Sequence, residues 1–358
     1  MTALALYRLP YAEQAMMLRG ETEEFLSCHD LNGKEGFVFA PFHITPEQPV
    51  ILIRPWEMST LPLSSVAKGG DDLRHYFEES HLTTAEPDPD YAADFATFHA
   101  QLQAGTFQKL VLSRCAVETP ARRHEFIDLF RMACSAYPRM FVSVVMTEKG
   151  GLWLSATPEL LLAGDGEQWR TTALAGTMKL EGEQLSFDTP KPVGAGRRDV
   201  EWSDKNIREQ RLVATYISEC LSRFTADIRE EGPRTVRAAN LAHLRSDFTF
   251  TLPDSQHIGD LLQELYPTPA VCGLPKREAF DFILQHEHTP RAYYSGFMGP
   301  LAVESATNLY VNLRCMEICE KNYRLYAGGG LLTDSTVSQE WLETEAKLET
   351  MRALANVF

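Results

Sequence analysis

Residues 107–117 read FQKLVLSRCAV, and this stretch decides the fold class. Apolar and polar positions alternate along it as they do in a β-strand, where successive side chains point to opposite faces. Lys109 then shares one face with Val111 and Ser113, while Leu110 and Leu112 point the other way. A lysine here either protects an edge strand from aggregation or points into the molecule, where it can lose its proton and act as a base. The stretch predicts a strand and leaves both roles open for Lys109.

The segments around this strand predict further strands and several helices. Short β-patterns predict strands at 140–146, 152–155, 159–163, 310–318 and 324–327. Helical periodicity predicts helices at 91–102, 124–137, 205–224, 257–265, 277–286 and 338–355. Groups of strands separated by helices, without a regular βαβ alternation, indicate an α+β protein with large, mostly antiparallel sheets.

The length of 358 residues suits two regions within one continuous domain. Residues 1–90 mix short apolar runs with Pro and Gly, which predicts a strand-rich N-terminal part, and residues 91–358 carry most of the motifs described below. The stretches most typical of linkers are 83–91 and 181–198.

The charge balance argues against several classes of partner. Lys and Arg number 34 and Asp and Glu 49, so 34 − 49 gives a formal net charge of −15. Nucleic acids and anionic membranes attract positive surfaces, so we expect neither as a partner. No apolar run approaches the ~20 residues of a membrane span, and the first residues lack the pattern of a secretory signal. Seven scattered cysteines without a CxxC motif are typical of reduced thiols, so we expect a cytoplasmic protein.

Three carboxylates and a lysine lie on helix faces that otherwise continue as apolar stripes. Glu209 lies four residues before Val213, and Glu340, Glu343 and Lys347 share a face of the 338–355 helix. Each can be a solvated surface group, because surface ion pairs are common and contribute only about 0.3–0.5 kcal/mol. Together the carboxylates offer hard oxygen ligands, which suit Mg²⁺.

Two other features also have alternative interpretations. Glu159 precedes the apolar run 160–162 and is either a surface carboxylate or a group that its surroundings keep protonated. Residues 172–177 (TALAGT) and 327–330 (AGGG) place small residues between strands and loops. Such loops are either tight turns or sites where backbone N–H groups approach a carboxylate. The histidines form no metal or triad pattern, and we interpret them as surface or hydrogen-bonded residues.

Taken together, nine segments follow the order found in the chorismate-utilising enzymes, a family that the chain resembles. The segments are KLVLSR (109–114), LWLSATPELLL (152–162), TALAGT (172–177), SDKNIREQRLV (203–213), LYPTPAVCGLP (265–275), RAYYSG (291–296), NLRC (312–315), YAGGGLL (326–332) and EWLETEAKL (340–348). The resemblance implies a fold whose antiparallel sheets form a central sandwich with helices packed outside. It also implies a chorismate-binding catalytic region at 91–358.

Two positions distinguish members of this family. Isochorismate and salicylate synthases have a water-activating lysine at the start of the KLVLSR-like strand, where this chain has Lys109. Aminodeoxychorismate synthase has a nucleophilic lysine in its AGT-like motif, where this chain has Ala175. The resemblance therefore implies a Mg²⁺-dependent isochorismate synthase, an isomerase that uses water. The alternatives are salicylate synthase, which also expels pyruvate, and a catalytically silent chorismate-binding protein.

The resemblance also implies a role for each site residue. Lys109 would take a proton from the water that attacks C2 of chorismate, and Glu159 would protonate the departing C4 hydroxyl. Glu209 and Glu343 would bind Mg²⁺, with Glu340 acting through water. The predicted substrate-binding residues are Thr172, Ala175, Gly176, Thr177, Tyr294, Arg314, Gly328, Gly329 and Lys347.

Two of the departures from the family pattern affect the surroundings of the site. Tyr266 stands where the family has histidine, and Asn206 stands where it has an acidic residue. The first change affects contacts of a loop, and the second affects waters around the metal. The resemblance further implies a monomer whose small-molecule ligands are chorismate and isochorismate. Menaquinone synthesis is the expected pathway, in preference to siderophore synthesis.

Overall fold

The computed structural model describes residues 2–63, 86–120, 123–180, 191–192, 201–252 and 257–356. The helices are η1 (Cys28–Leu31), α2 (Pro89–Gln103), α3 (Phe126–Ala136), α4 (Asp204–Leu221), α5 (Ile258–Leu265), α6 (Lys276–His286) and α7 (Val337–Asn356). The strands are β1 (Ala3–Arg8), β2 (Gln14–Phe25), β3 (Gly36–Ala40), β4 (Val50–Pro62), β5 (Lys109–Glu118), β6 (Phe141–Thr147), β7 (Gly151–Thr157), β8 (Leu160–Asp165), β9 (Gln168–Lys179), β10 (Lys191–Pro192), β11 (Ile228–Ala238), β12 (Leu241–Thr251), β13 (Gly273–Leu274), β14 (Phe297–Leu301), β15 (Ala306–Val311), β16 (Cys315–Ile318) and β17 (Tyr323–Leu331).

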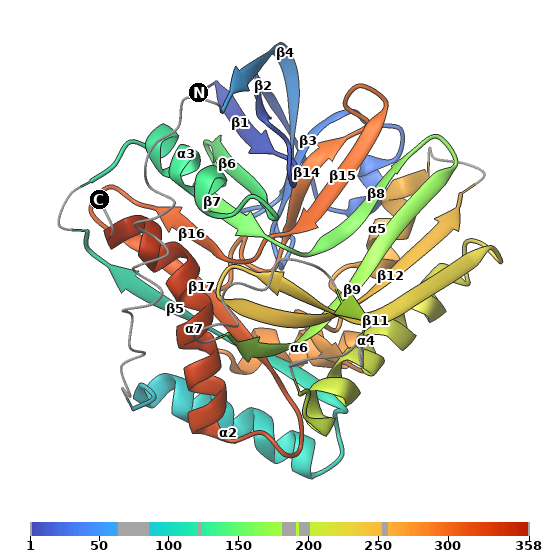
Figure 1. Cartoon of the computed structure of the whole chain (residues 1–358), viewed down its shortest axis with the longest axis vertical. Helices are drawn as coiled ribbons and strands as arrows, with labels where there is room; N and C mark the ends of the chain where they lie inside the picture. Colours follow the sequence, from blue (N-terminus) through green and yellow to red (C-terminus); the bar gives the residue numbers. More distant parts are fainter. Residues whose placement is uncertain are drawn as a thin grey trace.

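The described strands form one continuous hydrogen-bonded ribbon in which neighbours are antiparallel. Their spatial order is β13-β5-β17-β16-β7-β6-β1-β2-β4-β3-β14-β15-β8-β9-β12-β11-β10. The ribbon turns back on itself at β4 and β3, so that its two halves lie face to face (Figure 1). This is the α+β sandwich that the sequence predicts.

Aromatic side chains fill the space between the two halves of the ribbon. Phe141 of β6 stacks on Tyr310 of β15 with ring centroids 4.3 Å apart. Trp153 of β7 meets Phe39 of β3 edge-on at 6.3 Å, and Phe39 stacks on Tyr293 at 4.0 Å. Each such ring buries a large apolar area and gains a further ~0.5–1.5 kcal/mol from its aromatic partner. These contacts hold the two halves together around an apolar core.

Helices cover the outer faces of the sandwich. The apolar stripe of α4, including Val213 and Ile217, packs with α5 against β9 and β12. Helices α3 and α7 cover β6, β7, β16 and β17, where Leu354 lies in the same buried cluster as Leu325. Helices α2 and α6 lie beside β5 at the opposite end from β2 and β4 (Figure 1). Helices α4 and α7 therefore approach the sheets from different sides.

Most predicted elements are present, but two predictions were wrong. Residues 310–318 form two strands, because β15 ends at Val311 and β16 begins at Cys315. Residues 172–177 and 327–330 lie within strands β9 and β17, although we expected loops at both places. Predicted linker 181–198 lies almost wholly outside the described residues, and α2 begins at Pro89 within the other predicted linker.

The division at residue 90 stays a prediction, and strands from both sides of it pair with one another. Strand β1 pairs with β6, and β3 pairs with β14. Among the described residues, no helix is both long enough and apolar enough to cross a bilayer.

Candidate active site

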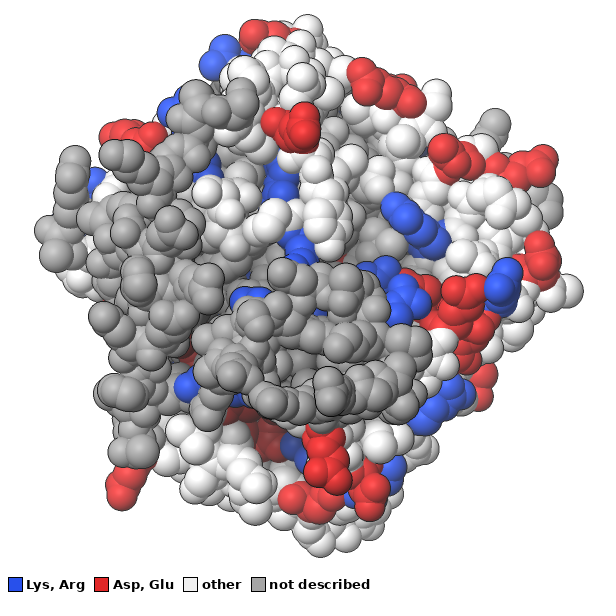
Figure 2. Space-filling model, in the orientation of Figure 1, with Lys and Arg blue, Asp and Glu red and all other residues white. Residues whose placement is uncertain are grey.

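A pocket that is partly open to solvent lies where β5, β9, β12 and β17 meet helices α4 and α7. The predicted site residues that line it are Glu159, Ala175, Gly176, Thr177, Glu209, Tyr294, Arg314, Gly328 and Lys347. Arg314 and Lys347 are the cations among these residues. Blue Lys and Arg side chains and red Asp and Glu side chains are both visible on the face of the molecule drawn in Figure 2. The protein is acidic overall, but the pocket offers cations to an anionic ligand.

Lys109 lies directly behind Glu209 at the pocket wall. Its side chain is fully buried, and its Nζ lies 2.9 Å from Glu209 Oε1 as an ion pair. The described residues offer this Nζ no well-aligned hydrogen-bond acceptor. The side chain of Lys109 therefore points into the molecule and does not lie on an exposed sheet edge, because β5 is paired with β13 and with β17.

Gly330 of β17 makes this arrangement possible. A Cβ atom at Gly330 would lie 2.1 Å from Glu209 Oε1 and 2.9 Å from Lys109 Cε, closer than atoms can approach. The absence of a side chain lets α4 bring Glu209 onto the strand. Ser203 begins α4 by accepting a hydrogen bond from the Asn206 N–H, and this cap fixes where the helix starts.

Glu159 lies in the pocket wall just before β8 and is 4% exposed. Burial raises the pKa of its carboxyl group to about 8, although the charges of Lys109, Lys347 and Arg314 act in the opposite direction. At neutral pH most molecules therefore keep this proton. Of the two interpretations that the sequence allows for Glu159, the protonated group is the one that fits.

Arg314 is a buried cation that faces the pocket. It lies in the break between β15 and β16 with a positive φ of 47°. Burial lowers its pKa to about 10, so it remains charged at neutral pH. No carboxylate among the described residues forms a salt bridge with it, which leaves its guanidinium available for a substrate carboxylate.

His243 of β12 orients Arg314, and the sequence did not single it out. Arg314 donates a hydrogen bond to His243 Nε2 at 3.0 Å, so the other ring nitrogen carries the proton and donates to Gly176 O at 3.0 Å. Burial holds the pKa of His243 well below its usual value, and the nearby Arg314 and Lys347 lower it further. Only the register of β12 on β9 brings this histidine to the pocket, so no local motif could reveal it.

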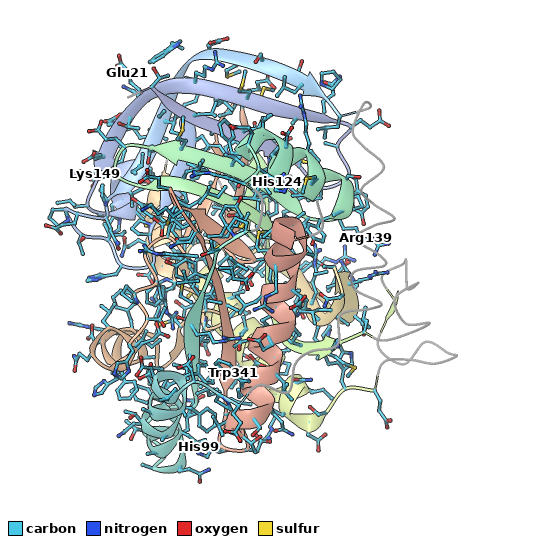
Figure 3. All side chains as sticks on the ribbon, turned by 90° about the vertical axis from the view of Figure 1, so that its left-hand side faces the viewer. Glu21, His99, His124, Arg139, Lys149 and Trp341 are labelled. Atoms are coloured by element: carbon cyan, nitrogen blue, oxygen red, sulfur yellow. The ribbon has the colours of Figure 1, made fainter. Side chains whose placement is uncertain are left out.

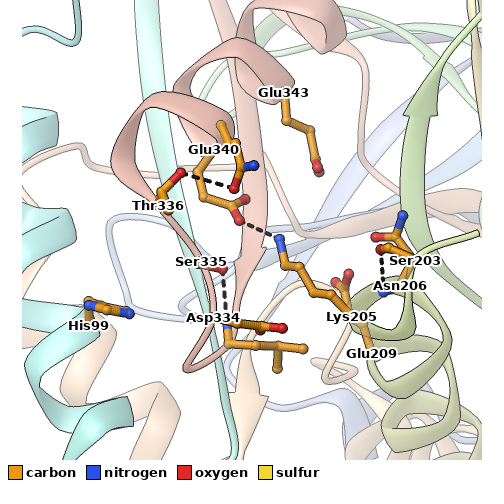
Figure 4. A network of polar contacts seen from close by, with 12 residues as sticks. His99, Ser203, Lys205, Asn206, Glu209, Asp334, Ser335, Thr336, Glu340 and Glu343 are labelled. Atoms are coloured by element: carbon orange, nitrogen blue, oxygen red, sulfur yellow. Dashed lines mark hydrogen bonds and ion pairs between the residues drawn. The ribbon is translucent and has the colours of Figure 1, made fainter.

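The C-terminal helix α7 presents Glu340 and Glu343 from a firmly anchored position. Arg114 of β5 donates to Thr344 Oγ1 at 2.8 Å, forms an ion pair with Glu345, and lies 3.6 Å above the Trp341 ring. The Trp341 ring also contacts Tyr91 of α2 edge-on at 5.2 Å (Trp341 is labelled in Figure 3). These contacts set the rotation of α7, which turns Glu340 and Glu343 toward α4 (Figure 4).

Each of the three acidic residues has a lysine beside it. Glu343 accepts from Lys347 Nζ at 2.7 Å, and the same ammonium donates to Gly328 O at 2.7 Å. Glu340, which is 1% exposed, forms an ion pair with Lys205 of α4. Burial, together with the charge of Glu343, raises the pKa of Glu340 to about 7.

The donor chemistry of these residues fits Mg²⁺. They supply only hard carboxylate oxygens, and Glu340 Oε2 is buried with no hydrogen-bond partner among the described residues. A Cβ at Gly329 would lie 3.0 Å from that oxygen and 3.8 Å from Glu343 Oε1, so both carboxylates approach the same bare stretch of β17. As placed, no three His, Cys, Asp or Glu residues of the described chain close around one point, because the lysines lie among them.

Three other residues singled out in the sequence, Thr172, Tyr266 and Asn206, do not line the pocket. Thr172 lies outside the pocket, and its hydroxyl donates to Leu160 O at 2.9 Å. Tyr266 is buried, with its hydroxyl 2.8 Å from Ser295 O. Asn206 packs against Gly176, whose hypothetical Cβ would lie 3.1 Å from the Asn206 Cβ. Asn206 therefore contacts the pocket wall through its aliphatic carbon.

Comparison with known proteins agrees with this geometry. The family model described as "Chorismate binding enzyme" matches residues 63–355. The chain belongs to the chorismate-binding enzyme family. Isochorismate synthase EntC of Escherichia coli (strain K12) is 30% identical over 251 residues, which cover 70% of this chain and 62% of EntC. Isochorismate synthase DhbC of Bacillus subtilis (strain 168) is 30% identical over 281 residues, 76% of this chain and 69% of DhbC.

The chorismate-binding enzyme fold extends beyond the aligned sequence. The structure of MenF, the menaquinone-specific isochorismate synthase from Escherichia coli, matches with a TM-score of 0.73 over 99% of this chain and 89% of MenF, at 23% identity. This likeness shows a shared fold. The sequence match spans less than two thirds of the length of EntC.

Proposed function

We propose that the chain is an isochorismate synthase, which isomerises chorismate to isochorismate. The observation that carries this proposal is the pairing of a buried lysine with a buried, protonated carboxylic acid at one pocket. Lys109 lies behind Glu209 on one wall, and Glu159, with a pKa of about 8, lies on another. A base and an acid of this kind suit the addition of water at one ring carbon and the loss of hydroxyl at another.

In this mechanism, water attacks C2 of chorismate and gives its proton to the neutral Lys109. The ring double bonds shift, and the bond between C4 and its hydroxyl oxygen breaks. Glu159 gives its proton to this oxygen, which leaves as water. One water enters and one leaves, so the product is an isomer and the reaction runs in both directions. Before it acts as a base, Lys109 must therefore release both its own proton and its ion pair with Glu209.

The cations of the pocket would bind the substrate. Arg314, held by His243, and Lys347, held by Gly328 O, would bind carboxylates of chorismate. Glu209 and Glu343 would hold Mg²⁺, with Glu340 contributing through water, and the bound ion would neutralise a substrate carboxylate. We also infer a monomeric, cytoplasmic enzyme that supplies menaquinone synthesis.

Incubation of the purified protein with chorismate and Mg²⁺, followed by chromatographic separation of the products, tests this function. We expect isochorismate alone. Salicylate together with pyruvate would instead indicate a salicylate synthase, and no turnover at all would indicate a silent binding protein. Added ammonium should give no aminated product, because Ala175 cannot form a covalent adduct and Lys109 activates water.

Replacement of Glu343 by Gln tests the assignment of the metal site. The substitution keeps the size of the side chain but removes one negative charge from the cluster of Glu209, Glu340 and Glu343, so Mg²⁺ affinity should fall at least about tenfold. Calorimetric titration with Mg²⁺ measures this loss directly. Glu349→Gln is the control, because Glu349 lies on the same helix and pairs with Arg352 instead. Unchanged Mg²⁺ affinity in Glu343→Gln would show that the metal binds elsewhere.

A further inference from the structure

Among the described residues, Lys205 is the one lysine beside the acidic cluster for which the proposed reaction has no use. The cluster, defined as Glu209, Glu340 and Glu343, has an ammonium group beside each carboxylate. Lys109 is the proposed base and Lys347 a substrate ligand. When all six groups are charged, three carboxylates and three ammonium groups have no net charge, so a divalent cation meets a site whose negative charge is already neutralised.

The position of Lys205 places its charge among all three carboxylates. It lies four residues before Glu209 on α4, so the two side chains leave the helix on the same face. Its ammonium reaches across to Glu340 of α7, with Glu343 and Glu209 on either side (Figure 4). Burial alone would lower the pKa of Lys205, but the charges of Glu340, Glu343 and Glu209 outweigh burial and raise it.

Of the three lysines, Lys205 is the one that can move. The side chain of Lys109 is fully buried, and Lys347 is also tied to Gly328 O. Lys205 is 20% exposed, and Glu340 is the only hydrogen-bond partner recorded for its ammonium within the described chain. Rotation of its flexible stem toward solvent would free Glu340 without disturbing β5 or β17.

We propose that Lys205 is a tethered cation that occupies the position of Mg²⁺ when the metal is absent and is displaced when the metal binds. The inference rests on the proposed function, because it takes the acidic cluster to be the Mg²⁺ site. It explains why three clustered carboxylates are tolerated without a metal, since an uncompensated buried charge is strongly destabilising. It also explains why Glu340 Oε2 has no hydrogen-bond partner in the described chain, because one ammonium cannot replace all the contacts of a metal ion.

Direct measurement of Mg²⁺ binding without substrate tests this competition. In Lys205→Met, which keeps an aliphatic stem but loses the charge, Mg²⁺ should bind about tenfold or more tightly than in the wild type, by calorimetric titration. Arg208→Gln is the matched control. Arg208 lies one turn further along α4, is 56% exposed and pairs with Asp334 rather than with the cluster. Its loss removes the same formal charge from the helix, so it measures the general electrostatic effect.

Thermal unfolding distinguishes a Lys205 that Mg²⁺ displaces from a Lys205 that forms a permanent salt bridge between α4 and α7. With EDTA, Lys205→Met should unfold at a lower temperature than the wild type, and saturating Mg²⁺ should abolish most of that difference. A fixed bridge would cost the same stability with and without Mg²⁺, and that result would overturn the inference. So would an affinity gain no larger than that of Arg208→Gln. If the wild type binds no Mg²⁺, the metal assignment of the proposed function fails as well.

Discussion

Replacement of Lys109 by Ala is expected to lower kcat by about 10²–10⁴ in both directions, because loss of a positioned general base typically costs that much. Substrate affinity should change little, since Arg314 and Lys347 remain in place. Stopped assays from chorismate and from isochorismate measure kcat, and calorimetry with the inactive variant measures binding separately. A surface lysine on a sheet edge would have no such effect.

Lys109→Met controls for packing in this experiment. The Lys109 side chain is fully buried, so the alanine variant also loses buried contacts and leaves Glu209 without its ion pair. The methionine variant restores most of the volume but not the amine, and it should remain as inactive as the alanine variant. Recovery of kcat in Lys109→Met would show that the lysine fills space and does not act as the base.

Replacement of Glu159 by Gln is expected to cost a similar factor of about 10²–10⁴, because an amide cannot protonate the leaving hydroxyl. In the wild type, kcat should fall as pH rises through about 8, where Glu159 loses its proton. The residual activity of Glu159→Gln should lack this alkaline limb. An identical alkaline limb in both proteins would assign the titration to another group.

Titration of the Glu159 carboxyl group should also change the stability of the folded protein with pH. Its pKa in the folded protein, about 8, lies above the ordinary value of 4.5, so the folded state binds this proton more tightly than the unfolded state. Its contribution is therefore fully present below pH 4.5 and is lost progressively as pH rises through 8. Glu159→Gln has no such proton to lose, so its melting temperature relative to wild type should rise between pH 5 and pH 9. Comparison of the two proteins at each pH cancels the titration of other groups, including Glu340.

Local sequence patterns predicted those elements that depend only on residues close together in the sequence. The alternation around Lys109 and the apolar stripe through Val213 are properties of a single strand and a single helix, and both are present. The break between β15 and β16 was missed because a left-handed residue that is not glycine, here Arg314, leaves no mark in an alternating pattern. Residues 172–177 were misinterpreted because small side chains are typical of turns but also allow a strand to lie beside α4.

The candidate site was predicted as a set of chemical groups but not as an arrangement. Spacing within one helix indicated that Glu340 and Glu343 share a face, but their proximity to Glu209 depends on how α4 and α7 meet across β17. His243 and Lys205 were not predicted for the same reason. Their partners, Arg314 and Glu340, are 71 and 135 residues away along the chain.

The backbone at Arg314 suggests a conflict between folding and ligand binding at one position. A non-glycine residue in the left-handed region costs roughly 1–2 kcal/mol, and a buried guanidinium without an ion-pair partner costs more. Folding stability alone would favour glycine at position 314, because an anionic ligand offsets both costs only while it is bound. A library randomised at position 314 and sorted for heat resistance should therefore enrich glycine, and the recovered proteins should no longer retain chorismate. Arg314 therefore provides ligand binding at the expense of folding stability.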